Sequence, residues 1–174
     1  TILKTMERVG ILPALALAQV ITYLVSNDYK TRHFRIIKQN IKKVLYLASA
    51  MTMLFTLLFY MRPHFFLWIL NKSASYNELI AFTLPIIAVL IIFDVIQVIL
   101  AAALRGAADV KLVMISRLAV AGFIFVPLAY AITISPIKSL LIKFALLYGS
   151  VHISLACMSL IYVIRFKSGI WKRQ

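Results

Sequence analysis

The stretch LIAFTLPIIAVLIIFDVIQVILAAAL, residues 79–104, decides the fold of this 174-residue chain. It is longer than the roughly 20 apolar residues that an α-helix needs to cross a bilayer, and it lacks the strict alternation of a membrane β-strand. Asp94 interrupts it near the middle, where inserting a carboxylate costs about 2.5–3.5 kcal/mol. Such a group usually binds a cation or moves a proton, so Asp94 is the first candidate for a functional residue.

The composition places the rest of the chain in the membrane as well. Hydrophobic residues make up 63% of it and charged residues 14%, with a mean hydropathy of +0.98, whereas a soluble domain is about half apolar and about a quarter charged. The net charge of +14 comes mainly from the segments between apolar runs, as in cytoplasmic loops. No aromatic-interleaved basic patch predicts nucleic-acid binding, and no phosphate loop, nucleophile elbow or His-Glu metal motif predicts an enzyme.

Five apolar runs predict an all-α integral membrane protein, a single bundle of five transmembrane helices surrounded by lipid. A sheet is excluded because the runs are too long and do not alternate. Pro13 and Pro127 fall inside two of the runs, and membrane helices can accommodate such residues as kinks. The expected spans are residues 6–27, 42–70, 78–104, 110–133 and 138–165.

The basic residues indicate how these spans are oriented. Most of them fall in residues 28–43, in residues 105–117 and in the tail from Arg165, which the five spans place on one side of the membrane. The positive-inside rule assigns that side to the cytoplasm. We therefore expect a bacterial inner (plasma) membrane protein with its C-terminus inside and its N-terminus outside. Because an outer N-terminus follows naturally if other spans come first, we also expect that helices upstream of Thr1 are missing.

The third span carries the main candidates for chemistry, Asp94 and Gln97. They lie three residues apart, so both side chains share one face of the helix. A carboxylate and an amide oxygen form a hard-oxygen pair suited to Na⁺, or to a proton held with a neighbouring acceptor. The alternative is a protonated Asp94 that hydrogen-bonds another helix and serves only structure.

Other polar residues in the spans have two interpretations each. His152, near Ser150 and Ser154, is either a proton relay or, as we favour, an interhelical hydrogen-bond partner. Tyr130 and Tyr148 either line a cavity or belong to the aromatic belt at the membrane surface, and the belt is the favoured interpretation.

Three residues at the ends of the predicted spans have ordinary roles by default. Glu7 and Asp28 fall at helix ends, where surface exposure or capping is expected. Trp171 is expected to anchor the tail at the membrane surface.

The sequence AAALRGAADVK, residues 101–111, predicts a tight cytoplasmic turn between the third and fourth spans. Gly106 permits a positive φ there, and Asp109 can cap the helix that follows. Arg105 can bind lipid phosphate or the dipole end of its own helix. Lys111 adds a further positive charge to this side of the bundle.

The segment FDVIQVILAAALRGAADVK, residues 93–111, resembles the D-x-x-Q-V … G-x-L-R-G-x-x-D-T-K segment of multidrug and toxic compound extrusion (MATE) transporters of the NorM-like branch. LPALA at residues 12–16 resembles the start of the eighth helix of that family. Ala108 and Val110 stand where the family usually carries Gly and Thr. The order of helices and loops extends the resemblance to nearly the whole chain, as a C-terminal lobe without its first helix.

The resemblance implies a function. MATE proteins have twelve helices in two lobes and exchange Na⁺ or H⁺ for organic cations by alternating access, which gives multidrug and xenobiotic efflux. By position, Asp94 matches the tenth-helix acid linked to cation coupling. The partners would be the missing N-terminal lobe or other membrane helices, and the coupling ion would be the only cofactor. Two alternatives stay open: a transporter remnant that serves as a structural subunit of a membrane assembly, and a flippase of lipid-linked substrates.

Overall fold

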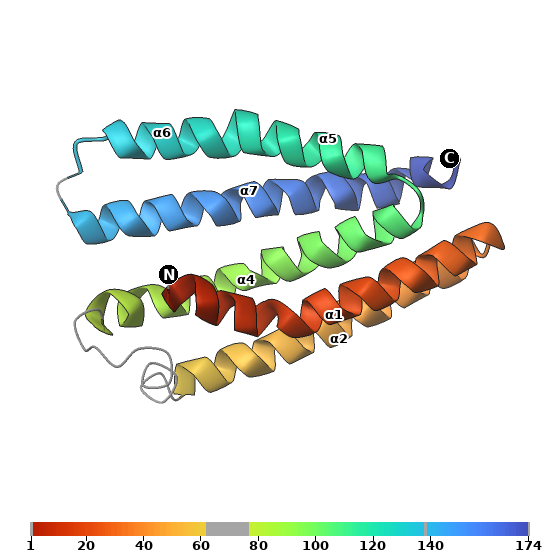
Figure 1. Cartoon of the computed structure of the whole chain (residues 1–174), viewed down its shortest axis with the longest axis horizontal. Coiled ribbons are helices and arrows are strands. Elements are labelled where there is room, and N and C mark those ends of the chain that lie inside the picture. Colours follow the sequence, from red (N-terminus) through yellow and green to blue (C-terminus); the bar gives the residue numbers. More distant parts are fainter. Residues whose placement is uncertain (1, 62–76, 138, 174) are drawn as a thin grey trace.

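The protein is an all-helical bundle over the part of the chain that the structure describes (Figure 1). This structure is a computed structural model, and it describes residues 2–61, 77–137 and 139–173. It confirms the predicted all-α fold of five long helices, one of which changes its winding along its length. The elements are α1 (Ile2–Lys30), α2 (Phe34–Met61), α4 (Asn77–Gly106), the continuous series α5 (Val110–Val120), η2 (Ala121–Phe125) and α6 (Val126–Ile134), then α7 (Leu140–Ser168) and the short η3 (Ile170–Arg173).

The helices have the length and the surface of membrane spans. Glu7–Lys30, Phe34–Leu58, Val110–Ile134 and Ile142–Ser168 are each long and apolar enough to cross a bilayer. The outer face of the bundle carries large apolar side chains, of which Leu118 is 78% exposed and Phe123 84% exposed. Lipid tails accept such a surface, whereas water would not. The chain is therefore an integral membrane protein.

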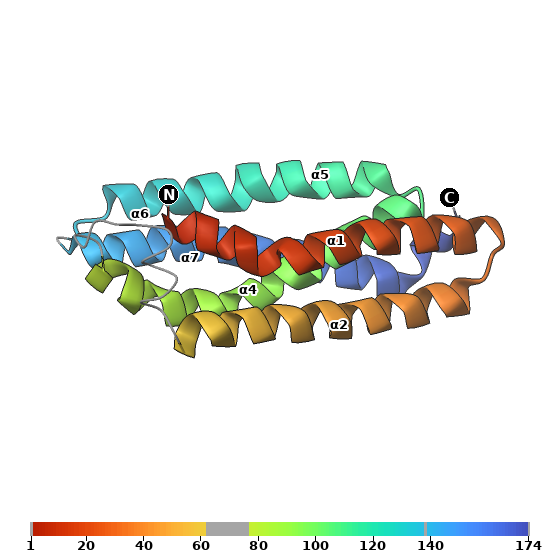
Figure 2. The same ribbon diagram turned by 60° about the horizontal axis from the view of Figure 1, so that its bottom comes forward.

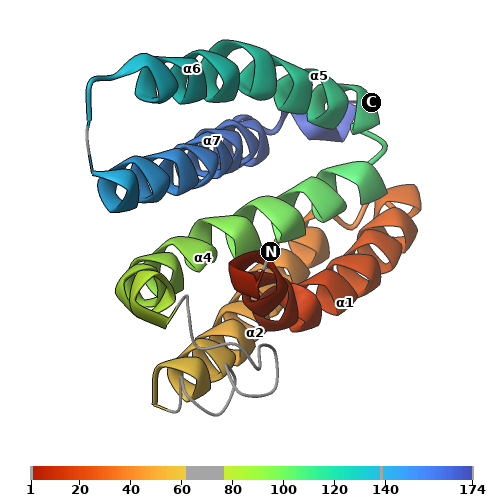
Figure 3. The same cartoon turned by 60° about the vertical axis from the view of Figure 1, so that its left-hand side comes forward.

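Helix α4 lies at the centre of the bundle. It packs against α1 and α2 on one side and against α7 on the other, and α7 also contacts α5 and α6 (Figures 1 and 3). Helices α1, α4 and α7 run in one direction, and α2 and the α5–α6 series run in the other (Figures 1 and 2). The α1–α2 turn, the α4–α5 turn and the C-terminus consequently lie at the same end. The segments that the charge pattern placed on one side do share one end of the molecule.

Small residues allow α1 and α4 to pack closely. Ala18 of α1 and Ala102 of α4 are buried, and the Thr22 hydroxyl donates a hydrogen bond to Ala102 O at 3.1 Å. A Cβ atom on Gly106 would lie 2.6 Å from Thr22 O and 3.0 Å from Val25 Cβ. Gly106 is thus needed for helix contact, as small residues are in membrane bundles. Gly106 does not adopt the positive φ that glycine permits, because this residue still belongs to α4.

The hairpin between α1 and α2 is tighter than the sequence predicted. The second span was expected from residue 42, but α2 begins at Phe34 and the turn comprises only residues 31–33. Asn40 Nδ2 donates to Asp28 Oδ2 at 3.1 Å across the hairpin. Lys38 lies within this earlier part of α2. A lysine fits near the end of a membrane helix because its long side chain can place the charge in water. Residues 62–70, the other end of the predicted span, lie outside the described residues.

A π-helical segment precedes Pro127. Residues Ala121–Phe125 wind as a π-helix, with α5 before them and α6 after them. Proline lacks an N–H and its ring clashes with the carbonyl four residues earlier, so an α-helix must deform there. The wider turn accommodates Pro127 without ending the span, which the sequence predicted only as a kink.

Replacing Ala108 with glycine is expected to stabilise the protein. Ala108 has φ 64°, a left-handed conformation that costs an L-residue roughly 1–2 kcal/mol. Glycine removes most of that cost but loses more entropy on folding, so a net gain of about 1 kcal/mol is expected. The measurement is unfolding by sodium dodecyl sulfate, followed by circular dichroism.

The neighbouring Ala107→Gly is the matched control for this prediction. Ala107 is fully buried and is not among the residues with positive φ, so its replacement should destabilise the protein. If Ala108→Gly destabilised the protein as much as Ala107→Gly does, the left-handed conformation at residue 108 would be contradicted.

Candidate functional site

Two carboxyl groups and an imidazole come together between three helices. Glu7 of α1, Asp94 of α4 and His152 of α7 each offer one ligand atom, and these atoms lie within 4.8 Å of one another. Asp94 is 8% exposed and His152 is 1% exposed, and the side chain of Glu7 is 15% exposed. The sequence predicted that Asp94 lies inside the bundle, and the structure places it there. We call these three residues the acid–histidine cluster.

An aromatic face of α7 extends the acid–histidine cluster. The Tyr148 hydroxyl donates a hydrogen bond to Glu7 Oε2. Tyr148 lies one helical turn before His152, and the centroids of the two rings are 5.4 Å apart. Phe144, a further turn back, stacks on Tyr148 at 6.1 Å. One face of α7 therefore positions both a phenol and an imidazole against the acid of α1.

His152 is buried and makes no hydrogen bond to the residues that the structure describes. Its Nε2 lies 3.9 Å from Glu7 Oε1, too far for a hydrogen bond. Neither ring nitrogen has a hydrogen-bond partner in the described part of the chain. The neighbouring Ser150 and Ser154 bond instead to carbonyl groups of their own helix. The described part of the chain thus supplies no interhelical hydrogen bond of the kind expected for His152, and the imidazole is left open to a ligand or a proton.

Gln97 is buried beside Asp94 on α4 but faces a different neighbour. It is 3% exposed, and its Nε2 lies 3.8 Å from Met158 Sδ of α7. It therefore belongs to the contact between α4 and α7. The groups that the fold brings to Asp94 are Glu7 and His152, and an oxygen pair of Asp94 and Gln97 around Na⁺ stays a prediction.

Two residues of the site were not recognised from the sequence. Glu7 was expected at a helix end, but α1 begins at Ile2, so Glu7 lies more than one turn inside the helix. Tyr148 was assigned to the aromatic belt, although its four-residue spacing from His152 is a signal for a shared helix face. Tyr130, by contrast, is 68% exposed on α6. It therefore does not line the acid–histidine cluster, and its place in the aromatic belt stays a prediction.

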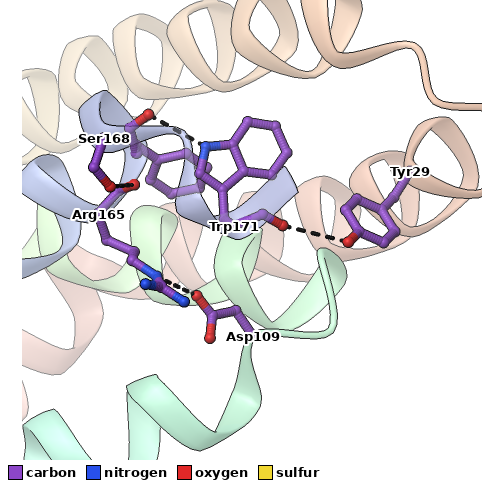
Figure 4. A network of polar contacts seen from close by, with 6 residues as sticks. Tyr29, Asp109, Arg165, Ser168 and Trp171 are labelled. Atoms are coloured by element: carbon purple, nitrogen blue, oxygen red, sulfur yellow. Dashed lines mark hydrogen bonds and ion pairs between the residues drawn. The ribbon is translucent and has the colours of Figure 1, made fainter. Parts of the chain in front are cut away.

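A second polar site lies at the end of the bundle that holds the turns (Figure 4). Arg165 Nε of α7 donates to Asp109 Oδ2 at 2.7 Å, and the side chain of Asp109 is 1% exposed. The predicted cap is wrong, because the Asp109 side chain makes no capping bond to α5. Arg105 and Lys111 are exposed on either side of this turn. The turn is thus fastened to α7 by an ion pair in which the acid is buried and the guanidinium is partly exposed.

The tail is fastened at the same end by Trp171, which is fully buried. Its Nε1 donates to Phe166 O at 3.2 Å, and the Tyr29 hydroxyl donates to Trp171 O at 3.3 Å (Figure 4). Its ring meets that of Phe34 edge-on at 5.6 Å. The expected anchoring of Trp171 at the membrane surface is wrong, because the ring anchors the tail to the α1–α2 hairpin.

The acid–histidine cluster has the chemistry of a cation or proton site. Two carboxylates this close repel each other in a low-dielectric interior, and a shared proton or a bound cation removes that repulsion. The imidazole adds a group that can accept a proton or donate a lone pair to a metal. Each group comes from a different helix, so an occupant of the site would link α1, α4 and α7.

Comparison with known proteins identifies the family. A family model described as MatE matches residues 2–131, a segment that contains Glu7 and Asp94. Tyr148 and His152 lie beyond the matched segment. No curated protein and no solved structure matches the chain. Because the MatE match covers most of the chain and the structure is a bundle of long apolar helices, the protein belongs to the MatE family of membrane transporters, which are not enzymes.

Proposed function

We propose that the chain is part of a cation-coupled antiporter for organic cations, in which the acid–histidine cluster binds the coupling Na⁺ or H⁺. The observation that carries this proposal is the meeting of Glu7, Asp94 and His152 from three helices. An acidic group inside a membrane bundle is costly and is usually kept for an ion or proton pathway.

The position of the cluster supports a role in alternating access. A bound ion or proton would hold α1, α4 and α7 together, and its release would favour a state in which these helices separate. A ligand shifts such an equilibrium only through its different affinity for the two states. An organic cation attracted by the same carboxyl groups would compete with the coupling ion. Exchange of an organic cation for the coupling ion requires that the two cannot occupy the acidic site at the same time.

The transport path would need helices beyond these five. Repeat-built transporters place the binding site between two halves, so we propose an N-terminal lobe or equivalent membrane helices as partner. The shared end of the α1–α2 turn, the α4–α5 turn and the tail would face the cytoplasm of a bacterial inner membrane. The flippase alternative is less favoured, because Glu7 and Asp94 make the described cluster acidic rather than basic.

The test is efflux of a fluorescent organic cation by cells that lack their own exporters. The chain is expressed together with a MATE N-terminal lobe, the cells are loaded with ethidium, and efflux is started by a Na⁺ or proton gradient. Asp94→Asn should lower the initial rate at least about tenfold, because coupling free energies of 1–3 kcal/mol correspond to roughly 5–150-fold.

The control for this test is Asp28→Asn, which changes an acid of the α1–α2 hairpin at the other end of α1. It should leave efflux within twofold of the unchanged protein. Immunoblots of the membrane fraction must show equal amounts of each variant. Coupled efflux that is unchanged by Asp94→Asn would contradict the proposed role of the acid–histidine cluster. Absence of efflux from the unchanged protein would favour the structural subunit instead.

A further inference from the structure

We propose that Glu7, Asp94 and His152 form a Zn²⁺ site between α1, α4 and α7. The proposal concerns the same cluster as the proposed coupling site, but it depends only on the geometry of the three ligands. It requires neither a substrate nor an ion gradient. It also depends on His152, which lies outside the segment that matches the family model.

The kinds of ligand favour zinc over the alkali and alkaline-earth ions. Imidazole nitrogen and carboxylate oxygen are common Zn²⁺ ligands, whereas Na⁺, Mg²⁺ and Ca²⁺ prefer oxygen alone. Two carboxylates balance the charge of a divalent ion, so the occupied site carries no net charge into the membrane. Three protein ligands leave a fourth position of a tetrahedral ion for water.

The distances need little adjustment. Zinc bonds of about 2.0–2.2 Å in a tetrahedron place the ligand atoms roughly 3.3–3.6 Å apart. The ligand atoms now lie within 4.8 Å of one another, and His152 Nε2 is 3.9 Å from Glu7 Oε1. Small side-chain rotations would close the remaining gap. The ion would draw together groups that the fold has already placed next to each other.

Two further observations point to a ligand. His152 is 1% exposed, and neither of its nitrogens has a hydrogen-bond partner in the described part of the chain. Leaving a buried polar group unpaired is unfavourable, and a metal bond to Nε2 would recover part of this cost. The Tyr148 hydroxyl donates a hydrogen bond to Glu7 Oε2. The other oxygen of this carboxyl group, Oε1, faces His152. A hydrogen bond of this kind orients a metal-binding carboxylate.

The experiment is a Zn²⁺ titration of the purified, tag-free chain in lipid nanodiscs, in competition with a chromophoric chelator and in buffer containing excess Na⁺. One tightly bound Zn²⁺ per chain is expected. His152→Asn should weaken binding at least about tenfold, because even the loss of an outer hydrogen bond to a ligand costs 10–100-fold. Tyr148→Phe should weaken binding less than His152→Asn does.

Controls separate this site from other zinc ligands of the chain. His33 is exposed in the α1–α2 turn, and Cys157 is a free thiol on α7. The third histidine of the sequence is His64. His33→Asn, His64→Asn and Cys157→Ser should each leave the affinity for zinc within twofold. Bound Co²⁺ should give the visible bands of a tetrahedral nitrogen and oxygen site without a thiolate charge-transfer band.

Clear outcomes would overturn the proposal. The first is a zinc affinity of His152→Asn equal to that of the wild type. The second is a loss of zinc binding when His33, His64 or Cys157 is replaced. If His152→Asn fails to fold, the proposal is tested by zinc binding to Asp94→Asn and by the X-ray absorption spectrum of the zinc-loaded wild type. That spectrum must show an imidazole ligand with bonds near 2.0–2.2 Å. Failure of zinc binding would leave the efflux prediction for Asp94 intact, and failure of efflux would leave zinc binding intact.

Discussion

Asp109→Ala is expected to lower the free energy of unfolding by about 3 kcal/mol, the lower end of the range for breaking a buried ion pair, because one partner of this pair is only partly buried. Asp109 is fully buried at the α4–α5 turn, and Arg165 of α7 is 16% exposed. Alanine would leave the guanidinium without its partner and would release the turn from α7. The measurement is unfolding by sodium dodecyl sulfate in mixed micelles, followed by far-ultraviolet circular dichroism.

A double-mutant cycle identifies the ion pair as the cause. Arg165→Met removes the other partner, and the double variant removes both charges. Because an apolar replacement of a buried pair can be nearly neutral, Asp109→Ala with Arg165→Met should be more stable than Asp109→Ala alone. Arg117→Met is the control, since Arg117 is exposed on α5. Additive effects of Asp109→Ala and Arg165→Met would contradict the pairing.

Trp171→Ala is expected to destabilise the protein by about 3–5 kcal/mol, the usual cost of removing a large buried aromatic ring. The ring is fully buried and contacts Phe34 and Phe166, and Tyr29 bonds to its carbonyl group. Removing it should release the tail from the hairpin. Unfolding by sodium dodecyl sulfate measures the loss, and limited proteolysis should cleave the tail faster.

Trp171→Phe is the matched control, because it keeps an aromatic ring but removes the hydrogen bond to Phe166 O. It should cost about 1–3 kcal/mol, the range for leaving one buried group unpaired. A Trp68→Phe protein lacks the other tryptophan of the chain but keeps Trp171, and its Trp171 fluorescence should shift to longer wavelength on unfolding, because unfolding breaks the hairpin contact. Equal effects of Trp171→Ala and Trp171→Phe would show that the ring does not pack as described.

The fold class could be predicted from hydropathy, but several boundaries could not. The run at residues 79–104 exceeds what a soluble core helix needs, and five such runs gave the correct class. Hydropathy marks the part of a helix within lipid and does not show how far the helix extends beyond it. For this reason α2 was expected from residue 42 although it begins at Phe34. Gly106 was recognised as special, but close packing against Thr22 could not be deduced without the partner helix.

The candidate site could be predicted only in part, for a related reason. Asp94 is conspicuous because a carboxyl group inside an apolar run is costly wherever the helix packs. Glu7 near the start of a span and Tyr148 within the last one are unremarkable in sequence. They become part of a site only when α1 and α7 meet beside α4. Asp109 likewise has the local pattern of a helix cap. Its partner Arg165 is more than fifty residues later in the chain, so the contact could not be read from the local sequence.

The central claim is that α1 and α7 meet at the acid–histidine cluster, and a double-mutant cycle between Glu7 and Tyr148 tests it most directly. The unfolding free energies of Glu7→Gln, Tyr148→Phe and the double variant are compared with that of the unchanged protein. The hydrogen bond between these side chains predicts a coupling energy of at least about 1 kcal/mol. A coupling energy of zero, with all variants folded, would contradict the site.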